Sequence, residues 1–209
     1  MSVAIIDYGS GNLRSVEKAF ARAVGDQAVS VISDGADVAA ATHLVLPGVG
    51  AFGDCKQGLD ALPGMVDAIR AHVAAGKPFL GICVGMQLLA KLGHEHGTHA
   101  GLGLIDGEVH PITPADPAMK VPHMGWNEIT VLDSTHPVLS ALPKGAHCYF
   151  ANSFAMRDVP ANQLLATVEY GETLTAAVGK DNVLGTQFHP EKSQAAGAAL
   201  IKAFTEWRP

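Results

Sequence analysis

The sequence has few charged side chains, few aromatic rings and no long apolar run. Charged residues make up 16% of its 209 residues, aromatic residues make up 6%, and the net charge at pH 7 is −6. Without a basic run the chain offers no surface suited to a phosphate backbone, so we expect no nucleic-acid partner. No apolar stretch approaches the length of a membrane span, and the first residues lack the basic region of a secretory signal. We therefore expect no membrane association.

Cysteine is also scarce. Cys55, Cys83 and Cys148 lie far apart, in no spacing typical of metal ligands. Their odd number argues against a disulfide framework. Free thiols are typical of a reducing compartment, so we expect a cytoplasmic protein.

The sequence is rich in hydrophobic residues, which make up 48% of it, and in glycine, of which it has 23. In the first ninety residues short apolar runs alternate with helical patterns, which predicts a parallel sheet covered by helices. The predicted strands are 3–6, 29–32 and 43–46, and the apolar run that begins at Phe79 predicts another. The predicted helices are 12–24, capped by Gly25, and one with its apolar face at Leu62, Val66, Ile69 and Val73.

From about residue 102 onward, short apolar runs are broken by Gly, Pro and Asp, which predicts strands, among them 148–154, followed by a last helix from about 194. We predict an α/β three-layer sandwich whose central, mostly parallel sheet is flanked by helices. A smaller set of mainly antiparallel strands belongs to the second half. No linker composition interrupts the chain, so we expect residues 1–209 to form a single domain.

The segment Gly81-Ile82-Cys83-Val84-Gly85 follows an apolar run, and Leu88, Leu89 and Leu92 after it predict a helix. This spacing matches a strand-turn-helix elbow that holds a nucleophile between two glycines. A thiol at a helix N-terminus is favoured as the thiolate. On this segment alone, a buried structural cysteine beside two packing glycines is an equally good interpretation.

A thiol nucleophile needs a base, and His189-Pro190-Glu191 follows a predicted strand directly. Pro190 restricts the backbone of His189, so the histidine and the carboxylate are held stiffly. A neutral imidazole can take the thiol proton, while the carboxylate selects the tautomer and stabilises the imidazolium. Taken alone, an exposed turn at a strand end is the more common explanation of this pattern.

The third candidate is the loop Pro47-Gly48-Val49-Gly50, at the end of a predicted strand. Its two glycines allow backbone N–H groups to turn toward a ligand, and with the N–H of Val84 they can form an oxyanion site. A plain Pro-Gly turn is the alternative. All three candidates follow strands, and the ends of parallel strands gather at one sheet edge, where open α/β sheets bind ligands.

Two other patterns resemble binding motifs but are incomplete, so they do not predict a nucleotide site or a catalytic zinc site. Gly9-Ser10-Gly11 is followed by Arg14 where a dinucleotide fingerprint needs its third glycine. In His94-Glu95-His96-Gly97-Thr98-His99 the second histidine of a zinc protease motif would stand at position 98, which is Thr. We therefore predict no cofactor and no catalytic metal, leaving adventitious metal binding open.

Taken together, Pro47-Gly48-Val49-Gly50, Gly81 to Gln87 and His189-Pro190-Glu191 make the sequence resemble the class I, or triad, glutamine amidotransferases, from Ile5 to Ser193. Two further segments narrow the resemblance: residues 7–13 (Asp-Tyr-Gly-Ser-Gly-Asn-Leu) and residues 122–127 (Pro-His-Met-Gly-Trp-Asn). They are similar to the branch that forms the glutaminase subunits of imidazole glycerol phosphate synthases in histidine biosynthesis.

The resemblance implies an enzyme that hydrolyses glutamine to glutamate and ammonia through a glutamyl thioester. In it Cys83 attacks the side-chain amide, His189 protonates the leaving ammonia and Glu191 orients His189. The residues implied in binding glutamine or shaping the oxyanion site are Gly48, Val49, Gly50, Val84, Gln87, Glu95 and Ser153.

The resemblance also implies a heterodimer with a (β/α)₈-barrel cyclase. Ammonia would pass through that barrel, and the partner would form imidazole glycerol phosphate and aminoimidazole carboxamide ribonucleotide. The residues that match the family's partner-facing surface are Asn12, Met124, Trp126, Tyr149 and Lys192. For Met124 and Trp126, ordinary core packing is the alternative.

The sequence departs from the family pattern at Val84, where Leu is usual, and more notably at Asn152 and Phe154. These two replace a histidine and a tyrosine near the expected glutamine site, which affects substrate contacts rather than the reaction.

Three other functions share parts of this pattern. The nearest is a glutaminase subunit for anthranilate or aminodeoxychorismate synthesis, with the same chemistry and another acceptor. An α/β-hydrolase with a cysteine nucleophile would have its acid before its histidine, whereas His189 precedes Glu191. The intact Cys, His and Glu speak against a non-catalytic binding subunit.

Overall fold

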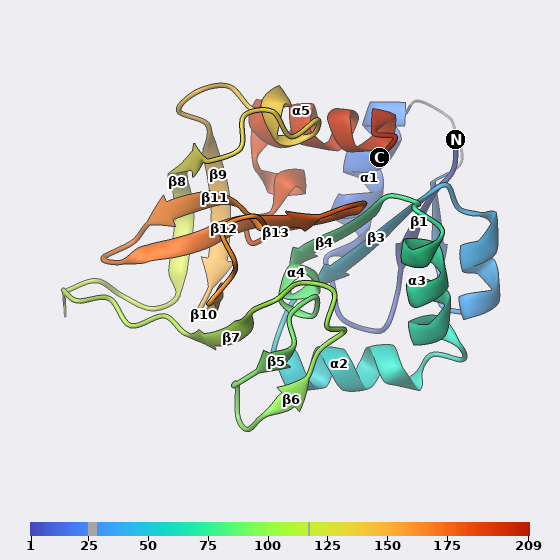
Figure 1. Cartoon of the computed structure of the whole chain (residues 1–209), viewed down its shortest axis with the longest axis horizontal. Coiled ribbons are helices and arrows are strands. Elements are labelled where there is room, and N and C mark those ends of the chain that lie inside the picture. The colour runs from blue at the N-terminus through green and yellow to red at the C-terminus, as the bar shows by residue number, and fades with distance from the viewer. Residues whose placement is uncertain (25–28, 117) are drawn as a thin grey trace.

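The computed structural model describes residues 1–24, 29–116 and 118–209. Within these ranges the largest element is a nine-stranded sheet (Figure 1). Its strands, in sheet order, are β2 (Val29–Ile32), β1 (Val3–Ile6), β3 (His43–Gly48), β4 (Phe79–Cys83), β13 (Val183–Thr186), β12 (Thr173–Lys180), β11 (Leu164–Glu169), β8 (His123–Val131) and β9 (His147–Asn152).

Neighbouring strands from β2 to β13 run parallel, and those from β13 to β9 run antiparallel. The antiparallel strands of the second half thus extend the parallel sheet. A smaller sheet has the order β10 (Phe154–Arg157), β7 (Glu108–Pro111), β5 (Leu92–Gly93) and β6 (His99–Ala100).

Helices cover both faces of the parallel half. Figure 1 shows α1 (Leu13–Val24) and α5 (Gln194–Glu206) on one face, and α2 (Phe52–Ala61) and α3 (Met65–Ala74) on the other. Phe20 of α1 meets Phe204 of α5 edge-on, with ring centroids 6.2 Å apart, and both rings are buried. The predicted three-layer α/β fold is therefore confirmed. Short 3₁₀ helices span Gly35–Ala40, Leu139–Ala141 and Pro190–Lys192.

The sheet order explains why the candidate residues meet. β3, β4 and β13 are adjacent and parallel, with Gly48 opposite Cys83 and Thr186 opposite Ile82. The segments that follow them, which begin with Val49, Val84 and Gln187, therefore leave the sheet at the same edge.

The predicted helix over Leu88, Leu89 and Leu92 is wrong. The helix after the elbow, α4, spans Val84–Gln87 only, and Leu92 begins β5. The carbonyls of the next residues are taken by another segment: Leu88 O accepts from Leu102 N at 2.7 Å, and Leu89 O accepts from the N–H groups of 104 and 105. A longer helix would need the same acceptors.

Other element bounds also differ from prediction. The strand predicted over 148–154 is two strands, β9 and β10, which break at Ser153 and belong to different sheets. Leu62 lies between α2 and α3, and α2 itself was not predicted. The expected cap at Gly25 lies outside the described residues. No helix among the described residues is long and apolar enough to cross a membrane.

Candidate functional site

Cys83 is the last residue of β4 and has a strained backbone, with φ 55° and ψ −113°. Non-glycine residues rarely adopt this conformation, which costs about 1–3 kcal/mol and is typical of functional sites. The flanking glycines make the turn possible. A Cβ on Gly85 would overlap the carbonyl oxygen of Leu46, and a Cβ on Gly81 would lie 2.6 Å from the Gly85 carbonyl oxygen. The elbow thus requires both glycines for close packing.

His189 and Glu191 form a buried pair beside Cys83. His189 Nδ1 lies 2.8 Å from Glu191 Oε1, and their side chains are 4% and 1% exposed. This contact leaves Nε2 of the imidazole for the thiol. Glu191 and the two residues that flank it form the 3₁₀ helix that begins at Pro190, so the histidine-carboxylate geometry is set locally.

The surroundings of His189 set its charge. Burial lowers the pKa of the imidazole, but hydrogen bonds and charge attraction from Cys83 and Glu191 outweigh that effect and raise the pKa to about 9. The imidazolium therefore persists at neutral pH, where it can hold a thiolate and later give its proton to a leaving group.

A cavity of about 340 Å³ opens over the Cys83 side chain. It is lined by Val49, Gly50, Cys83, Val84, Gln87, Glu95, Pro122, Ala151, Asn152, Ser153, Phe154, His189 and Lys192. The structure thus brings most of the sequence-predicted residues together around one space. Gly48 and Glu191 do not line the cavity: Gly48 ends β3 opposite Cys83, and Glu191 lies behind His189.

The glycine loop reaches the cavity through Val49 and Gly50. Gly50 has φ +99°, a conformation that favours glycine. The Cys55 thiol donates a hydrogen bond to the Val49 carbonyl at 3.3 Å, which ties the loop to α2. The N–H of Val84 is the first of α4, and the first N–H groups of a helix have no acceptor within it.

Gln187 was missed by sequence analysis. Its Nε2 lies 3.8 Å from the Cys83 sulfur, and its Oε1 accepts a hydrogen bond from Gln87 Nε2 at 3.0 Å. Gln87 also donates to the Phe154 carbonyl at 3.1 Å. The amide of Gln87 is therefore engaged with protein groups, and Gln187 is the side-chain amide next to the sulfur. The available signal was its place two residues before His189; in the structure Gln187 directly follows β13, the strand beside β4.

Glu95, Asn152 and Ser153 also contribute polar groups to the cavity lining. Glu95 accepts a hydrogen bond from the Phe52 N–H at 2.7 Å. Asn152 donates to the Phe154 carbonyl at 2.9 Å, while its buried Oδ1 has no hydrogen-bond partner in the described part of the chain. Ser153 follows at the break between β9 and β10. An acceptor without a partner in a cavity marks a place for a ligand donor.

The predicted partner-facing residues are largely on β8 and β9. Met124 and Trp126 are 64% and 56% exposed, so their alternative assignment to the core is wrong. Trp126 lies opposite Tyr149, with ring centroids 4.9 Å apart, and Lys192 Nζ lies 5.5 Å from the Tyr149 ring centroid. Asn12 is partly exposed in the loop before α1, where Gly11 approaches Pro47.

The three cysteines are free and buried. Among the residues that the structure describes, one group of side chains outside the cavity has the composition of a metal site: His94, Glu108 and His110. His96 and His99, which belong to the motif set aside in the sequence, are not part of this group.

Comparison with known proteins agrees with the geometry. The family model described as Glutamine amidotransferase class-I matches residues 4–206. A Rhodospirillum rubrum protein named imidazole glycerol phosphate synthase subunit HisH is 53% identical, with 100% of both chains covered. A protein of the same name from Bradyrhizobium diazoefficiens is 52% identical, again with 100% of both chains covered.

Solved structures show the same fold at low identity. A crystal structure of a glutamine amidotransferase superposes with a TM-score of 0.75 at 19% identity, covering 99% of this chain and 98% of the other. A chain of PurLQS from Thermotoga maritima gives a TM-score of 0.68 at 17% identity, covering 98% of this chain and 97% of that one. The family match over residues 4–206 and the full-length relatives leave one conclusion: this chain belongs to the class I glutamine amidotransferase family.

Proposed function

We propose that the chain, as one domain over residues 1–209, is the glutaminase subunit of an imidazole glycerol phosphate synthase in histidine biosynthesis. The observation that carries the proposal is the buried contact of His189 with Glu191 at 2.8 Å beside the strained Cys83. Full-length relatives that bear that subunit's name, at 53% and 52% identity, support the choice of reaction.

In the proposed reaction the Cys83 sulfur attacks the side-chain amide carbon of glutamine. The oxyanion of the tetrahedral intermediate is held by the N–H of Val84 together with an N–H of the Gly48–Gly50 loop; one such donor is typically worth about 10²–10³ in rate. The C–N bond then breaks, and His189 gives its proton to the departing ammonia. Water activated by His189 hydrolyses the glutamyl thioester, releasing glutamate and the free thiol.

Glutamine is expected to lie in the cavity with its amide at Cys83 and its amino-acid end near Glu95 and Ser153. The carboxylate of Glu95 and the unpartnered Oδ1 of Asn152 are both acceptors suited to the α-ammonium group. Asn152 thus supplies a contact in place of the imidazole that the family pattern has there.

A cyclase with a (β/α)₈ barrel is the proposed partner, and it would receive the ammonia out of contact with solvent. Exposed Met124 and Trp126 on one face of β8, with Tyr149 beside them, provide an aromatic patch of the kind enriched at interfaces. Lys192 lies over Tyr149 and also lines the cavity, so it connects the patch to the glutamine site.

The experiment is product formation by the chain mixed with the barrel cyclase, with either glutamine or ammonium salt as nitrogen source. We expect Cys83→Ala to abolish glutamine-dependent synthesis and to leave ammonia-dependent synthesis intact. Cys148→Ala, which removes a buried thiol outside the cavity, is the matched control and should retain both. Glutamine-dependent synthesis by Cys83→Ala would overturn the catalytic role. Activity only with a chorismate-using partner would overturn the assignment to histidine biosynthesis.

A further inference from the structure

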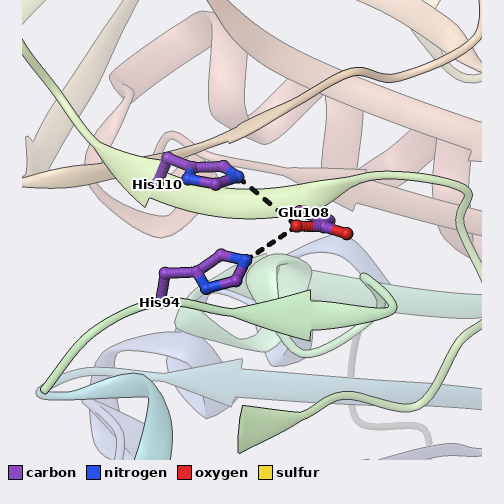
Figure 2. A group of neighbouring side chains, drawn as sticks. All are labelled: His94, Glu108 and His110. Atoms are coloured by element: carbon purple, nitrogen blue, oxygen red, sulfur yellow. Dashed lines mark hydrogen bonds and ion pairs between the residues drawn. The ribbon is translucent and has the colours of Figure 1, made fainter. Parts of the chain in front are cut away.

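A second histidine-carboxylate group lies on the smaller sheet. Glu108 and His110 are two residues apart on β7, so their side chains share one face of the strand. His94 follows β5, which pairs with β7, and its N–H donates to the Val109 carbonyl at 2.9 Å. Figure 2 shows the side chains of His94, just after β5, and His110, on β7, converging on the Glu108 carboxylate. The backbone pairing fixes the arrangement.

The distances fit a common bound ion. Nε2 of His94 and Nε2 of His110 lie 2.7 Å and 3.5 Å from Glu108 Oε2. One ligand atom from each residue lies within 4.8 Å of the others. Ligand atoms about 2.0–2.2 Å from a tetrahedral zinc are about 3.3 Å apart from one another. A shift of under about 1.5 Å therefore brings three ligand atoms onto one ion.

The surroundings also suit a metal. The Thr98 hydroxyl lies 3.4 Å from His94 Nδ1, so it can accept the Nδ1 proton and leave Nε2 free as a ligand. The side chains of His94, His110 and Glu108 are 28%, 36% and 38% exposed, which gives an ion access from solvent.

We propose that His94, Glu108 and His110 bind a divalent transition-metal ion of the zinc class. Two imidazoles and a carboxylate form a nitrogen-rich set that suits Zn²⁺ and its neighbours, whereas Mg²⁺ and Ca²⁺ require oxygen ligands. Three protein ligands leave one tetrahedral position for water. The site is separate from the proposed glutaminase chemistry and does not depend on it.

The ion would act as a clamp between β5 and β7. His94 is followed directly by Glu95, whose carboxylate lines the cavity and accepts from Phe52 N. An ion at His94 therefore fixes one end of the segment that places Glu95. At 100 times the dissociation constant, a ligand of this kind stabilises the folded state enough to raise Tm by about 5–10 °C in a chain of this size.

Calorimetric titration with ZnCl₂ tests the site, using the full chain with Cys83→Ala so that the nucleophilic thiol cannot bind the ion. We expect one equivalent of Zn²⁺ to bind with micromolar or tighter affinity, and MgCl₂ not to bind. His110→Ala and Glu108→Gln should each weaken binding at least tenfold. His147→Ala, at an exposed histidine on β9, should leave binding unchanged.

Circular dichroism of each variant establishes that it is folded. Glu108→Gln keeps the shape of the side chain, so it still tests the site if His110→Ala does not fold. Anomalous scattering at the zinc edge should place the ion between His94 and His110. Absence of binding, or equal binding by the parent chain and the two cluster variants, would overturn the proposal.

Discussion

Two histidine-carboxylate pairs of nearly equal length occupy contrasting surroundings. His189 and Glu191 are 2.8 Å apart, with side chains 4% and 1% exposed. His94 and Glu108 are 2.7 Å apart, with side chains 28% and 38% exposed. The first pair lies beside a thiol, and the pKa of its imidazole is raised to about 9. The second pair faces solvent beside another imidazole.

The contrast shows that contact length does not set the chemistry. With water excluded, charge attraction between the partners is strong and the imidazole is held in one orientation, which suits proton transfer. With solvent access, the same contact can open to admit an ion. We therefore propose that the buried pair acts as a proton donor with a fixed geometry, and that the open pair provides ligands for an ion.

Removing the charge of each carboxylate should give the largest difference in activity between the two pairs. We expect Glu191→Gln to lower kcat for glutamine about 10²–10⁴-fold with little change in KM, because the carboxylate supports the imidazolium during the reaction. Glu108→Gln should leave kcat within about twofold in metal-free buffer. Steady-state kinetics of both variants with the partner present measure this. A pure KM effect in Glu191→Gln, or equal losses in the two variants, would contradict the assigned roles.

The backbone around the two pairs should respond differently to one added methyl group. Gly85→Ala places a Cβ on the Leu46 carbonyl, so the free energy of unfolding should fall by about 3 kcal/mol or more. Gly97→Ala, in the segment after His94, meets only the His99 ring at 3.5 Å and is strained chiefly by its φ of +133°, so we expect a loss of about 1–2 kcal/mol. Guanidinium unfolding measures both, and equal losses would refute the close packing of the elbow.

The pH profile of kcat/KM should show which of the two carboxylates acts on His189. Because the folded pKa of His189 is raised, the imidazolium persists at neutral pH and is lost as pH rises through about 9. The reaction needs that proton, so kcat/KM should fall above about pH 9. Glu191→Gln removes one of the causes that raise the pKa, so its falling limb should move to lower pH. Glu108→Gln should leave the pH of this fall in kcat/KM unchanged. An unchanged pH of the fall in both variants would contradict the pairing of His189 with Glu191.

The buried site was largely predictable because its signals are local. His189 and Glu191 are two residues apart with a proline between them, and Gly81 and Gly85 are spaced as an elbow requires. Alternating strands and helices predict a parallel sheet, and the ends of parallel strands meet at one edge. The order of β3, β4 and β13 then brings the segments together.

What could not be predicted depends on strand pairing across the chain. Gln187 reaches Cys83 because β13 lies beside β4, 104 residues away in sequence. His94 meets Glu108 through the pairing of β5 with β7, two short strands without a periodic pattern. The helix after the elbow ends at Gln87 because the segment after Gly101 takes the carbonyls of Leu88 and Leu89, which a longer helix would need.

The central claim is that Cys83 is the nucleophile that His189 serves. The most direct measurement is intact-mass and peptide mass spectrometry of the chain, acid-quenched during glutamine turnover with its partner. The account predicts a glutamyl adduct on the peptide that contains Cys83, and its loss in Cys83→Ala. An adduct on Cys55 or Cys148, or turnover with no adduct in any quenched sample, would contradict it.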